Sequence, residues 1–299
     1  MPFDWKQIYL SGILKRDFIF LQHGIIKDDF SGWLKKPNKN ISIFVTSTNS
    51  EYNLILNGNY MYNNDVVKLT GLPRFDKLLL DDVKTENLIL FSPTWRKSLV
   101  GETIPGTQSR TYNPNFKDSD YYKFYMKFVF NKRLLACIKK YNFKILFCVH
   151  PSFKAQMSDF ESNEFVKFET LIDYPLYFKK SKILVTDYSS VAYDFAYLKK
   201  PIIYSHFDKE SLLLNHTHSS ESTYNYEKDG FGDVTYDLDS SIDKLIEIIE
   251  NGCKMEKKYV DRVNKCFKYT DNNNCERVYN EILKLSKIKE RVLWNIRLV

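Results

Sequence analysis

A short polar stretch stands where an apolar run meets an apolar helical pattern. Thr186, Asp187, Ser189 and Ser190 follow an apolar run at residues 183–185, and "VAYDFAYLKK" continues with helical spacing. The first turn of a helix carries free N–H groups and a partial positive charge, which bind phosphate oxygens, and serine hydroxyls add neutral donors. The same residue types also cap helices without binding a ligand. The stretch alone therefore leaves two interpretations open, a phosphate site and a helix cap.

Two histidines close apolar runs in different halves of the chain. His23 lies in "QHG" and His150 lies in "VHP", each beside a loop-forming residue. A histidine can take a proton from a hydroxyl near neutral pH, or donate to a phosphate when it is charged. A lone histidine in such a place is more often structural, but two at corresponding positions favour a catalytic interpretation. We interpret His206, His216 and His218 as loop histidines, because no acidic or cysteine neighbour completes a metal site.

Arginines follow two further apolar runs. Arg74 lies in "GLPRFD", and Arg96 lies in "SPTWR" two residues after Thr94. A guanidinium group can grip phosphate with two parallel hydrogen bonds, although a surface ion pair would also explain either arginine. Near the end, "YTDNNNCERV" places Asp271 before a helical pattern that carries Arg277, which alone is typical of a helix cap.

The composition excludes several classes of protein. The formal net charge of +7 suits an anionic ligand, an anionic polymer or a membrane surface, and no basic tail or repeat indicates nucleic acid. The five cysteines show no C-x-x-C spacing, so we expect reduced thiols in a cytoplasmic protein and no zinc site. The sequence contains no nucleophile elbow, P-loop or dinucleotide-binding fingerprint. It also has no apolar run of about 18 residues, as a transmembrane helix requires.

Continuous apolar runs predict strands that are buried on both faces. The runs are "DFIFLQHG", "ISIFVTSTN", "VVKLTGLPR", "NLILFSPTWR", "FKILFCVHP", "KILVTDYSS" and "PIIYSH". Helical patterns lie between them at residues 121–141, 191–200 and 241–252, the last with Ser241 as its expected N-cap and Gly252 as its stop. Strands that alternate with helices indicate an α/β fold with parallel sheets.

The polar motifs come directly after these predicted strands. In open parallel sheets, ligands bind at the carboxyl ends of the strands. The turn-rich segment at residues 100–120 is expected to be a mobile loop beside this edge. The residues expected at the carboxyl ends of the strands are His23, Thr46, Arg74, Thr94, Arg96, His150 and residues 187–190.

A charged stretch at residues 81–86 marks the expected domain boundary. We assign residues 1–84 to a partial N-terminal domain, residues 85–285 to a C-terminal ligand-binding domain and residues 286–299 to a tail. About three strands precede the boundary, which is few for a complete doubly wound domain. We therefore expect the first domain to be incomplete in this chain.

Taken in order, the motifs resemble those of one known family. They are "QHG", "TSTNSEY", "TGLPRFD", "FSPTWR", "VHP", "LVTDYSSVAYDFAYLKKPIIY", "YNYEKDGFGDV" and "YTDNNNCERV". Over residues 18–285 the chain is similar to the CDP-glycerol glycerophosphotransferase family, the polymerases and primases of teichoic acids and related capsules. The resemblance implies a GT-B fold, with two Rossmann-like domains facing across a cleft. It also implies a peripheral location on the inner face of the bacterial membrane.

The resemblance implies an enzyme that moves glycerol phosphate from CDP-glycerol, or a related polyol phosphate from its CDP-polyol, to a hydroxyl of a polymer and releases CMP. In this scheme His23 is the candidate base, while His150 contacts the pyrophosphate or assists proton transfer. The residues implied to contact the substrates are Gly24, Arg74, Thr94, Arg96, Thr186, Asp187, Ser189, Ser190, Asp271 and Arg277. The implied partners are the CDP-polyol, a polyol-phosphate or glycan acceptor on a lipid carrier and an anionic membrane surface. No nucleic acid, metal or cofactor is expected.

Two alternatives stay open on the sequence alone. A GT-B glycosyltransferase that uses a nucleotide sugar would release a nucleoside diphosphate instead of CMP. A truncated and inactive remnant would bind a nucleotide without turning it over. The identity of the released nucleotide discriminates among these functions.

Overall fold

The computed structural model describes residues 17–80, 82–107, 109–209 and 224–297 of the 299-residue chain. The chain divides into two compact units. The first unit comes from the described parts of Met1–Asp81, Ser222–Tyr224 and Asn264–Val299. The second comes from those of Asp82–Glu221 and Asn225–Val263.

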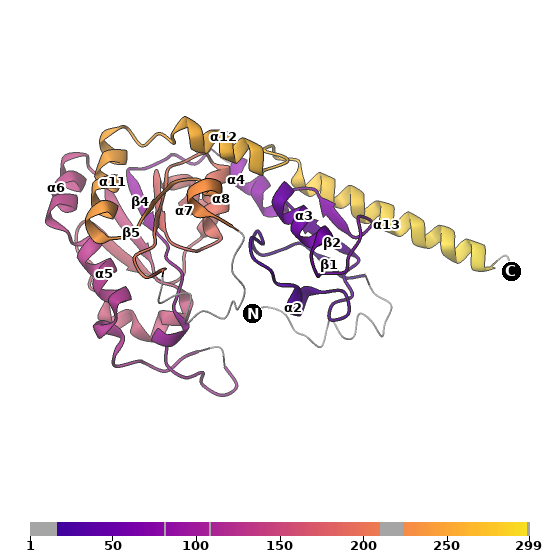
Figure 1. Cartoon of the computed structure of the whole chain (residues 1–299), viewed down its shortest axis with the longest axis horizontal. Coiled ribbons are helices and arrows are strands. Elements are labelled where there is room, and N and C mark those ends of the chain that lie inside the picture. Colours follow the sequence, from indigo (N-terminus) through magenta and orange to yellow (C-terminus); the bar gives the residue numbers. More distant parts are fainter. Residues whose placement is uncertain (1–16, 81, 108, 210–223, 298–299) are drawn as a thin grey trace. The chain divides into compact units, whose positions relative to one another are not determined.

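The first unit is built on a parallel three-stranded sheet in the order β1-β2-β3 (Figure 1). All four residues of the central strand β2 are buried. Phe44 of β2 packs edge-on against Phe20 and Tyr62, with ring centroids 5.1 and 5.6 Å apart, and these rings form the centre of the core. The strands are β1 (Ile19–Phe20), β2 (Ile43–Thr46) and β3 (Val67–Leu69). The helical segments are α2 (Ser31–Leu34), α3 (Asn49–Asn57), the 3-10 helix η1 (Pro73–Phe75), α4 (Asp76–Leu79) and α13 (Asn274–Arg297).

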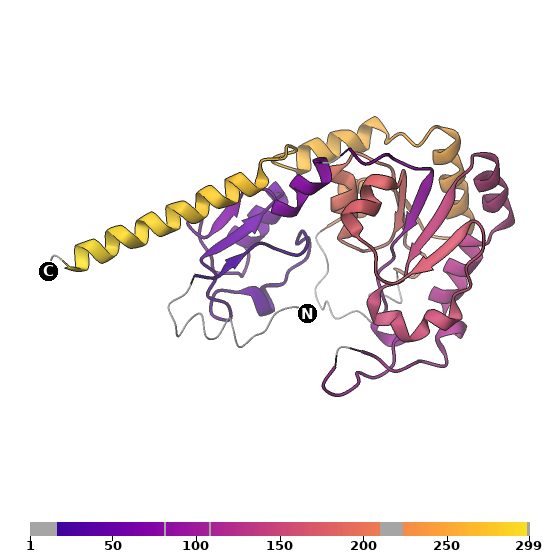
Figure 2. The same ribbon diagram turned by 180° about the vertical axis from the view of Figure 1, so that it is seen from behind.

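The C-terminal segment clusters with the first unit, whereas the expected boundaries placed residues up to 285 in the second domain and the rest in a tail. The helix α13 packs against η1 and β2, as Figures 1 and 2 show from opposite sides. Just before this helix, Phe267 packs edge-on against Phe75 with ring centroids 5.9 Å apart, and a backbone bridge joins Phe267 to Thr48. The helical pattern of α13 predicts an amphipathic helix, but it does not indicate which sheet receives it.

The second unit is built on a parallel six-stranded sheet in the order β6-β5-β4-β7-β8-β9. The strands are β4 (Leu88–Phe91), β5 (Lys144–Cys148), β6 (Val166–Glu169), β7 (Ile183–Thr186), β8 (Ile202–Ser205) and β9 (Asp233–Thr235). In its core Phe91 stacks on Phe147, with ring centroids 5.8 Å apart, and meets Phe128 edge-on at 5.1 Å. The α/β fold with parallel sheets is thus confirmed in both units.

Every strand predicted from the sequence is present, and among the described residues the two strands that were not predicted are β6 and β9. Both lie at the edges of the six-stranded sheet. In β6 a buried residue is followed by an exposed one, because an edge strand is less enclosed than a central strand. In β9, Asp233 and Val234 are only half-buried. Neither strand therefore carries the continuous apolar run by which the other strands were recognised.

The helices of the second unit cover both faces of its sheet, with α5, α6 and α11 on one side and α7 and α8 on the other (Figure 1). Their bounds are α5 (Asp120–Val129), α6 (Lys132–Lys140), α7 (Tyr174–Lys180), α8 (Val191–Tyr197), α10 (Tyr226–Asp229), α11 (Leu238–Glu250) and α12 (Lys257–Cys266). The 3-10 helices are η2 (Lys97–Leu99), η3 (Phe116–Asp118) and η4 (Pro151–Asp159).

Two helix predictions need correction. The pattern at residues 121–141 forms two helices, because the Asn131 side chain accepts the N–H groups of Arg133 and Leu134 and starts α6 anew. The N-cap of α11 is Asp237, whose carboxylate accepts the Ser240 N–H at 2.8 Å, and not Ser241. Ser241 lies buried within the helix, with its hydroxyl 2.7 Å from that of Thr235. The predicted stop is present, since Gly252 has a φ of 75° directly after the helix.

The segment expected to be a mobile loop contains ordered structure. A backbone bridge pairs Thr103 with Arg110, and η3 follows before α5 begins. Phe116 of η3 is fully buried among aromatic side chains, including Phe153 at 5.0 Å between ring centroids. Across the described residues, no helix has both the length and the apolar character that a membrane crossing requires.

Candidate functional site

Asp187 joins two loops at the carboxyl ends of the neighbouring strands β4 and β7. The residue follows β7 directly and is fully buried. One carboxylate oxygen accepts the backbone N–H groups of Thr94 at 2.8 Å and Tyr188 at 2.6 Å, and the other accepts from Arg96 at 2.9 Å. A buried carboxylate is stable only when its oxygens are hydrogen-bonded. Asp187 therefore fixes the "PTWR" loop against the polar stretch that follows β7.

Arg96 directs its donors toward acceptors inside the protein. Its Nε and Nη2 atoms donate to Asp208 at 2.8 and 3.1 Å, and Nη1 donates to the Thr94 carbonyl at 2.6 Å. The Arg96 side chain is only 7% exposed. Burial opposes the positive charge, but Asp187 and Asp208 outweigh it and raise the pKa of Arg96 above its ordinary value. A phosphate at Arg96 would have to compete with two carboxylates, so the arrangement favours a role in holding the loops together.

The helix-cap interpretation of the polar stretch explains only part of it. Ser190 is the N-cap residue of α8, but its side chain makes no capping hydrogen bond. The Ser189 hydroxyl accepts the Val191 N–H at a long 3.4 Å. The Thr186 hydroxyl is buried and donates to the carbonyl of Ser92 at 2.8 Å, which ties β7 to the end of β4. Within the described chain neither Ser189 nor Ser190 donates its hydroxyl proton to a protein acceptor, and both residues are half-buried.

His150 follows β5 and is held in one tautomer. Its Nδ1 atom accepts the backbone N–H of Ser152 at 3.1 Å, so the proton of the neutral ring lies on Nε2. The ring stacks on Trp95, with centroids 5.7 Å apart and an angle of 20° between the planes. Burial lowers the pKa of His150 to about 4. At neutral pH the residue is therefore an uncharged hydrogen-bond donor through Nε2.

In the first unit, Glu51 of α3 holds the turn that carries His23. The Glu51 carboxylate is fully buried and accepts from the Gln22 side chain at 3.3 Å and from the backbone N–H of Ile26 at 2.8 Å. Its other oxygen accepts the N–H of Ser47 at 2.8 Å. Gln22 and Ile26 stand on either side of His23, so one carboxylate fixes both flanks of the turn. The turn needs this support because Gln22 has a φ of 66°, which is unusual for a residue other than glycine.

The charges around His23 favour its neutral form. Partial burial of the ring, and then the positive charge of Arg74, lower the pKa of His23, although the residue as a whole remains exposed to solvent. Burial raises the pKa of Glu51 to about 7, against the opposing effect of the N–H groups that it accepts. The structure thus brings the predicted residues His23, Gly24 and Arg74 together at one edge of the first unit. Thr46, the last residue of β2, instead donates its buried hydroxyl to the carbonyl of Lys68.

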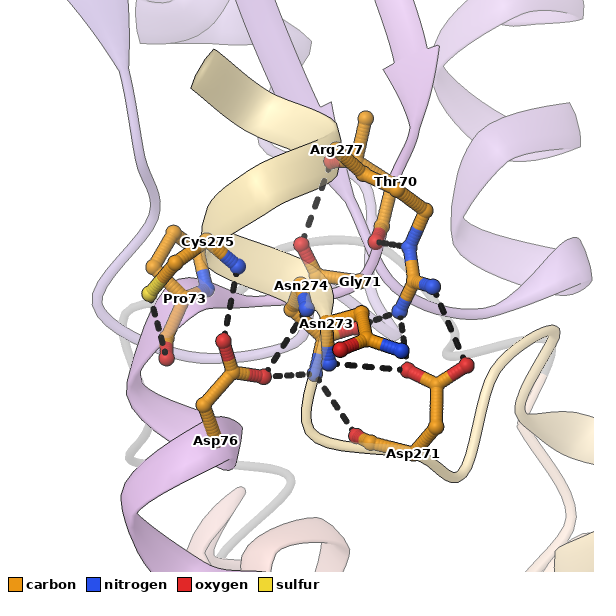
Figure 3. A network of polar contacts seen from close by, with 9 residues as sticks. All are labelled: Thr70, Gly71, Pro73, Asp76, Asp271, Asn273, Asn274, Cys275 and Arg277. Carbon is orange, nitrogen blue, oxygen red and sulfur yellow. Dashed lines mark hydrogen bonds and ion pairs between the residues drawn. The ribbon is translucent and has the colours of Figure 1, made fainter. Parts of the chain in front are cut away.

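Asp271 and Arg277 face each other before and within α13 (Figure 3). Arg277 donates to the two Asp271 carboxylate oxygens at 2.6 and 3.1 Å, to the Asn274 side-chain oxygen at 2.6 Å and to the Thr70 carbonyl at 2.8 Å. The guanidinium group also lies 3.8 Å from the ring centroid of Tyr269. Arg277 thereby ties the start of α13 to the end of β3. The arrangement favours a structural role over the predicted contact with a substrate.

Three residues of the networks around these sites were not singled out from the sequence: Glu51, Asp208 and Asp76, whose carboxylate accepts the backbone N–H of Asn274 at the start of α13. Thr48 and Glu51 form a T-x-x-E pattern, in which the Thr48 hydroxyl accepts the Glu51 N–H at 3.1 Å, so a capping-box search could have found this glutamate. Asp76 lies in the quoted "GLPRFD" motif without being singled out. Asp208, which pairs with Arg96, lies three residues beyond β8 and has no local sequence signal.

Metal-ligand chemistry finds no support in the described parts of the chain. Within them, no group of three His, Cys, Asp or Glu residues is placed to hold a metal ion. His206 is buried, and its Nε2 atom lies 3.3 Å from the Asp187 carbonyl oxygen, so it is not the solvated loop histidine that was expected. His216 and His218 lie outside the described residues.

Comparison with known proteins gives matches along nearly the whole chain. It is 43% identical over 289 residues to the minor teichoic acid biosynthesis protein GgaB of Bacillus subtilis (strain 168), covering 96% of this chain and 31% of that protein. It is 26% identical over 230 residues to the teichoic acid ribitol-phosphate polymerase TarL of Staphylococcus aureus (strain NCTC 8325 / PS 47), covering 71% of this chain and 36% of TarL. The chain thus spans about a third of the length of these two relatives.

A likeness to solved structures supports the fold. The wall teichoic acid polymerase TagF superposes with a TM-score of 0.61 at 18% identity, covering 92% of this chain and 69% of the TagF chain. This likeness confirms the GT-B-like α/β class expected from the sequence. The family model described as CDP-glycerol:poly(glycerophosphate) glycerophosphotransferase matches residues 22–284. Since this match spans most of the chain, the protein belongs to the CDP-glycerol:poly(glycerophosphate) glycerophosphotransferase family.

Proposed function

We propose that this chain carries a polyol-phosphate transferase activity, in which a hydroxyl of an acceptor polymer attacks the β-phosphorus of CDP-glycerol. A phosphorus–oxygen bond forms to the acceptor, the bond to the CMP oxygen breaks, and the hydroxyl proton passes to a base. The products are a phosphodiester-extended acceptor and CMP. The family match and the 43% identity to GgaB support this activity. The observation that carries it is a neutral histidine in each unit, each held by its own loop.

We assign the role of base to His23. Its lowered pKa keeps the imidazole neutral at pH 7, so a nitrogen lone pair is free to accept the hydroxyl proton. The exposure of His23 gives an acceptor access to the ring. The bonds from Glu51 to both flanks of the turn restrict its position, which is the requirement for efficient proton transfer.

We assign the donor phosphates to the second unit. The Nε2–H of His150 and the hydroxyls of Ser189 and Ser190 provide neutral donors for phosphoryl oxygens. Asp187 and Arg96 shape this surface from beneath, together with Thr94 and Thr186. The barrier is then lowered by positioning and by hydrogen bonds to oxygens that gain charge in the transition state.

The first unit then serves the acceptor, and the second serves the donor. We propose that the acceptor is a polyol-phosphate or glycan chain on a lipid carrier. The net charge of +7 is suited to an anionic polymer and to a peripheral position on the inner face of the membrane. Gly24 and Arg74 lie beside His23 on the acceptor side. Asp271 and Arg277 contribute by holding α13 to the first unit.

A donor panel tests the proposal. Purified chain is incubated with CDP-glycerol, CDP-ribitol and nucleotide sugars, each with a polyol-phosphate acceptor, and the released nucleotide is identified by chromatography. We expect CMP from CDP-glycerol or CDP-ribitol, and release that is slower by about a hundredfold or more from the His23→Ala variant. Release of a nucleoside diphosphate from a sugar donor would instead establish a glycosyltransferase. Nucleotide binding with no release from any donor would indicate the inactive remnant.

A further inference from the structure

The residues assigned to the donor phosphates provide no unpaired positive charge. Arg96 is matched by two carboxylates, Asp187 and Asp208, so this buried group has a net negative formal charge. His150 is neutral at pH 7 because its pKa is about 4. The diphosphate of a CDP-polyol carries about two negative charges at this pH. A cation near these loops would compensate charge that the predicted residues leave unbalanced.

Arg110 lies on an ordered hairpin that follows the "PTWR" loop. The backbone N–H of Ile104 donates to the Ser109 carbonyl at 2.9 Å, and that of Thr111 donates to the Glu102 carbonyl at 2.9 Å. Gly106 turns the chain at the tip with a φ of 75°. These bonds give Arg110 a defined place on one arm of the hairpin, opposite Thr103.

The hairpin places Arg110 against the aromatic pair at the end of β4 and β5. Its guanidinium carbon lies 5.7 Å from the ring centroid of Trp95, within the range of a cation–π contact. The same Trp95 ring stacks on His150 at 5.7 Å between centroids. Arg110 is therefore one ring away from the residue assigned to the pyrophosphate. It is half-buried and forms no hydrogen bond or ion pair through its side chain with any residue in the described part of the chain.

We propose that Arg110 is a further donor-binding residue, which contacts the diphosphate of the CDP-polyol beside His150. This inference rests on the proposed function, because it takes the carboxyl ends of β4, β5 and β7 as the donor site. Arg110 supplies the positive charge that Arg96 cannot offer, since the donors of Arg96 are directed to Asp187 and Asp208. The contact with the Trp95 ring limits the hydration of the guanidinium group, which strengthens a hydrogen bond to phosphate.

In a purely structural role, Arg110 would only hold the hairpin against Trp95 by packing on its ring. The two roles differ in what they require of the side chain. The packing role needs an apolar stem and a flat or polarisable end of the side chain, whereas the diphosphate contact needs a positive charge. Arg110→Met keeps the contact with Trp95 without the charge, and Arg110→Lys keeps the charge without the planar fork.

The test measures binding of CDP and of CDP-glycerol by calorimetry at low and high salt, with the full chain and these two variants. Arg133→Ala is the matched control, because Arg133 of α6 forms an exposed ion pair with Asp243 of α11. We expect Arg110→Met to weaken CDP binding roughly tenfold or more, and to reduce its dependence on salt. Arg110→Lys should retain most of the affinity, and the control should bind as the parent does.

The inference is overturned if Arg110→Met binds CDP as tightly as the parent chain, if both Arg110 variants lose affinity equally, or if the parent binds no CDP. A CMP-release assay on the same samples separates this result from the proposed function. If CDP affinity depends on the charge at Arg110 but the parent releases no CMP, the phosphate contact stands and the transfer activity fails. If the parent releases CMP with a kcat/KM that Arg110→Met leaves unchanged, the activity stands and the contact fails.

Discussion

The carboxylate of Asp76 accepts the backbone N–H of Asn274 at 2.9 Å, although the two residues are 198 positions apart in the chain. Its second oxygen accepts the N–H of Cys275 at 2.7 Å (Figure 3). An N-cap acceptor usually comes from the residue just before the helix. Here α4 provides the cap for α13, so two distant segments of the chain complete one helix start within the first unit. The negative charge also lies at the end of the helix where the dipole favours it.

Replacing this cap should loosen α13 specifically. We expect Asp76→Ala to lower the free energy of unfolding of the first unit by about 2 kcal/mol, because it leaves buried N–H groups without an acceptor. Hydrogen exchange should become faster at Asn274 and Cys275 while the β4 and β5 amides keep their protection. Asp65→Ala, at an exposed site in the same unit, is the control. Equal protection of α13 in both variants would contradict the assigned cap.

Gly71 is the second sensitive point of this network. It has a φ of 81°, and a Cβ atom added there would lie 1.8 Å from the side-chain oxygen of Asn274. Gly71→Ala should therefore destabilise the first unit by about 2 to 4 kcal/mol, from backbone strain and from displacement of Asn274. Gly32→Ala should have a small effect, since nothing lies within 4 Å of its added Cβ. Urea denaturation of both variants checks the difference, and similar midpoints would argue against a tight packing at Gly71.

The four inner strands of the six-stranded sheet and the three strands of the first unit could be predicted from the sequence because each carries a continuous apolar run. The edge strands β6 and β9 were not predicted, because their partial exposure permits polar residues such as Lys167 and Asp233, which interrupt an apolar run. The membership of α13 in the first unit was also beyond the sequence. It depends on a hydrogen bond between Asp76 and Asn274, and no local pattern specifies a partner so far along the chain.

The candidate site shows the same division between local and distant information. The positions of His23, His150 and Ser190 after strands could be predicted, because each residue lies in a short local motif that follows an apolar run. The ion pair that occupies Arg96 could not be predicted, because Asp208, which accepts its hydrogen bonds, lies 112 residues further along the chain. The motif thus identifies important residues more reliably than it identifies what each one contacts.

Glu51 links the stability of the first unit to pH. Its pKa rises from 4.5 in an open chain to about 7 in the folded protein. Between these values the folded state holds a proton that the unfolded state has lost, so this group makes stability fall as pH rises, and its contribution is constant above about pH 7. Glu51→Gln removes the titration. The stability of this variant relative to the parent should therefore increase from pH 5 to pH 7, as measured by urea denaturation across pH.

Glu51→Gln also tests whether Glu51 positions the turn that carries His23. A glutamine at this position presents its NH2 group either toward the N–H of Ile26, which releases that flank of the turn, or toward the N–H of Ser47, which frees the carboxamide from the end of β2 and so weakens its hold on the turn. We expect Glu51→Gln to lower the kcat of CMP release about tenfold or more while CDP binding stays within about twofold. Glu227→Gln, at an exposed residue of α10, is the control. An unchanged kcat would remove Glu51 from the positioning role.

Asp187 should be the most costly charge to remove from the second unit. Asp187→Ala leaves the Thr94 N–H unpaired and leaves Arg96 with one carboxylate instead of two. Breaking a buried ion pair by removing one partner typically costs about 3 to 5 kcal/mol, so we expect a large loss in the free energy of unfolding. Asp243→Ala removes the exposed partner of Arg133 and should change stability by less than about 1 kcal/mol. Comparable losses in the two variants would show that Asp187 is not a structural centre.

His23 and His150 should contribute differently to the pH dependence of CMP release. His150 stays neutral above about pH 5 because its pKa is about 4, so it should add no titration near neutrality. His23 must be neutral to accept a proton, and its pKa is below the ordinary 6.5. We therefore expect kcat/KM to fall as pH drops below 6.5, and this fall should be absent from the residual activity of His23→Ala. His150→Ala should instead raise KM for CDP-glycerol and retain the acid limb. An acid limb that disappears with His150 and persists without His23 would reverse the two assignments.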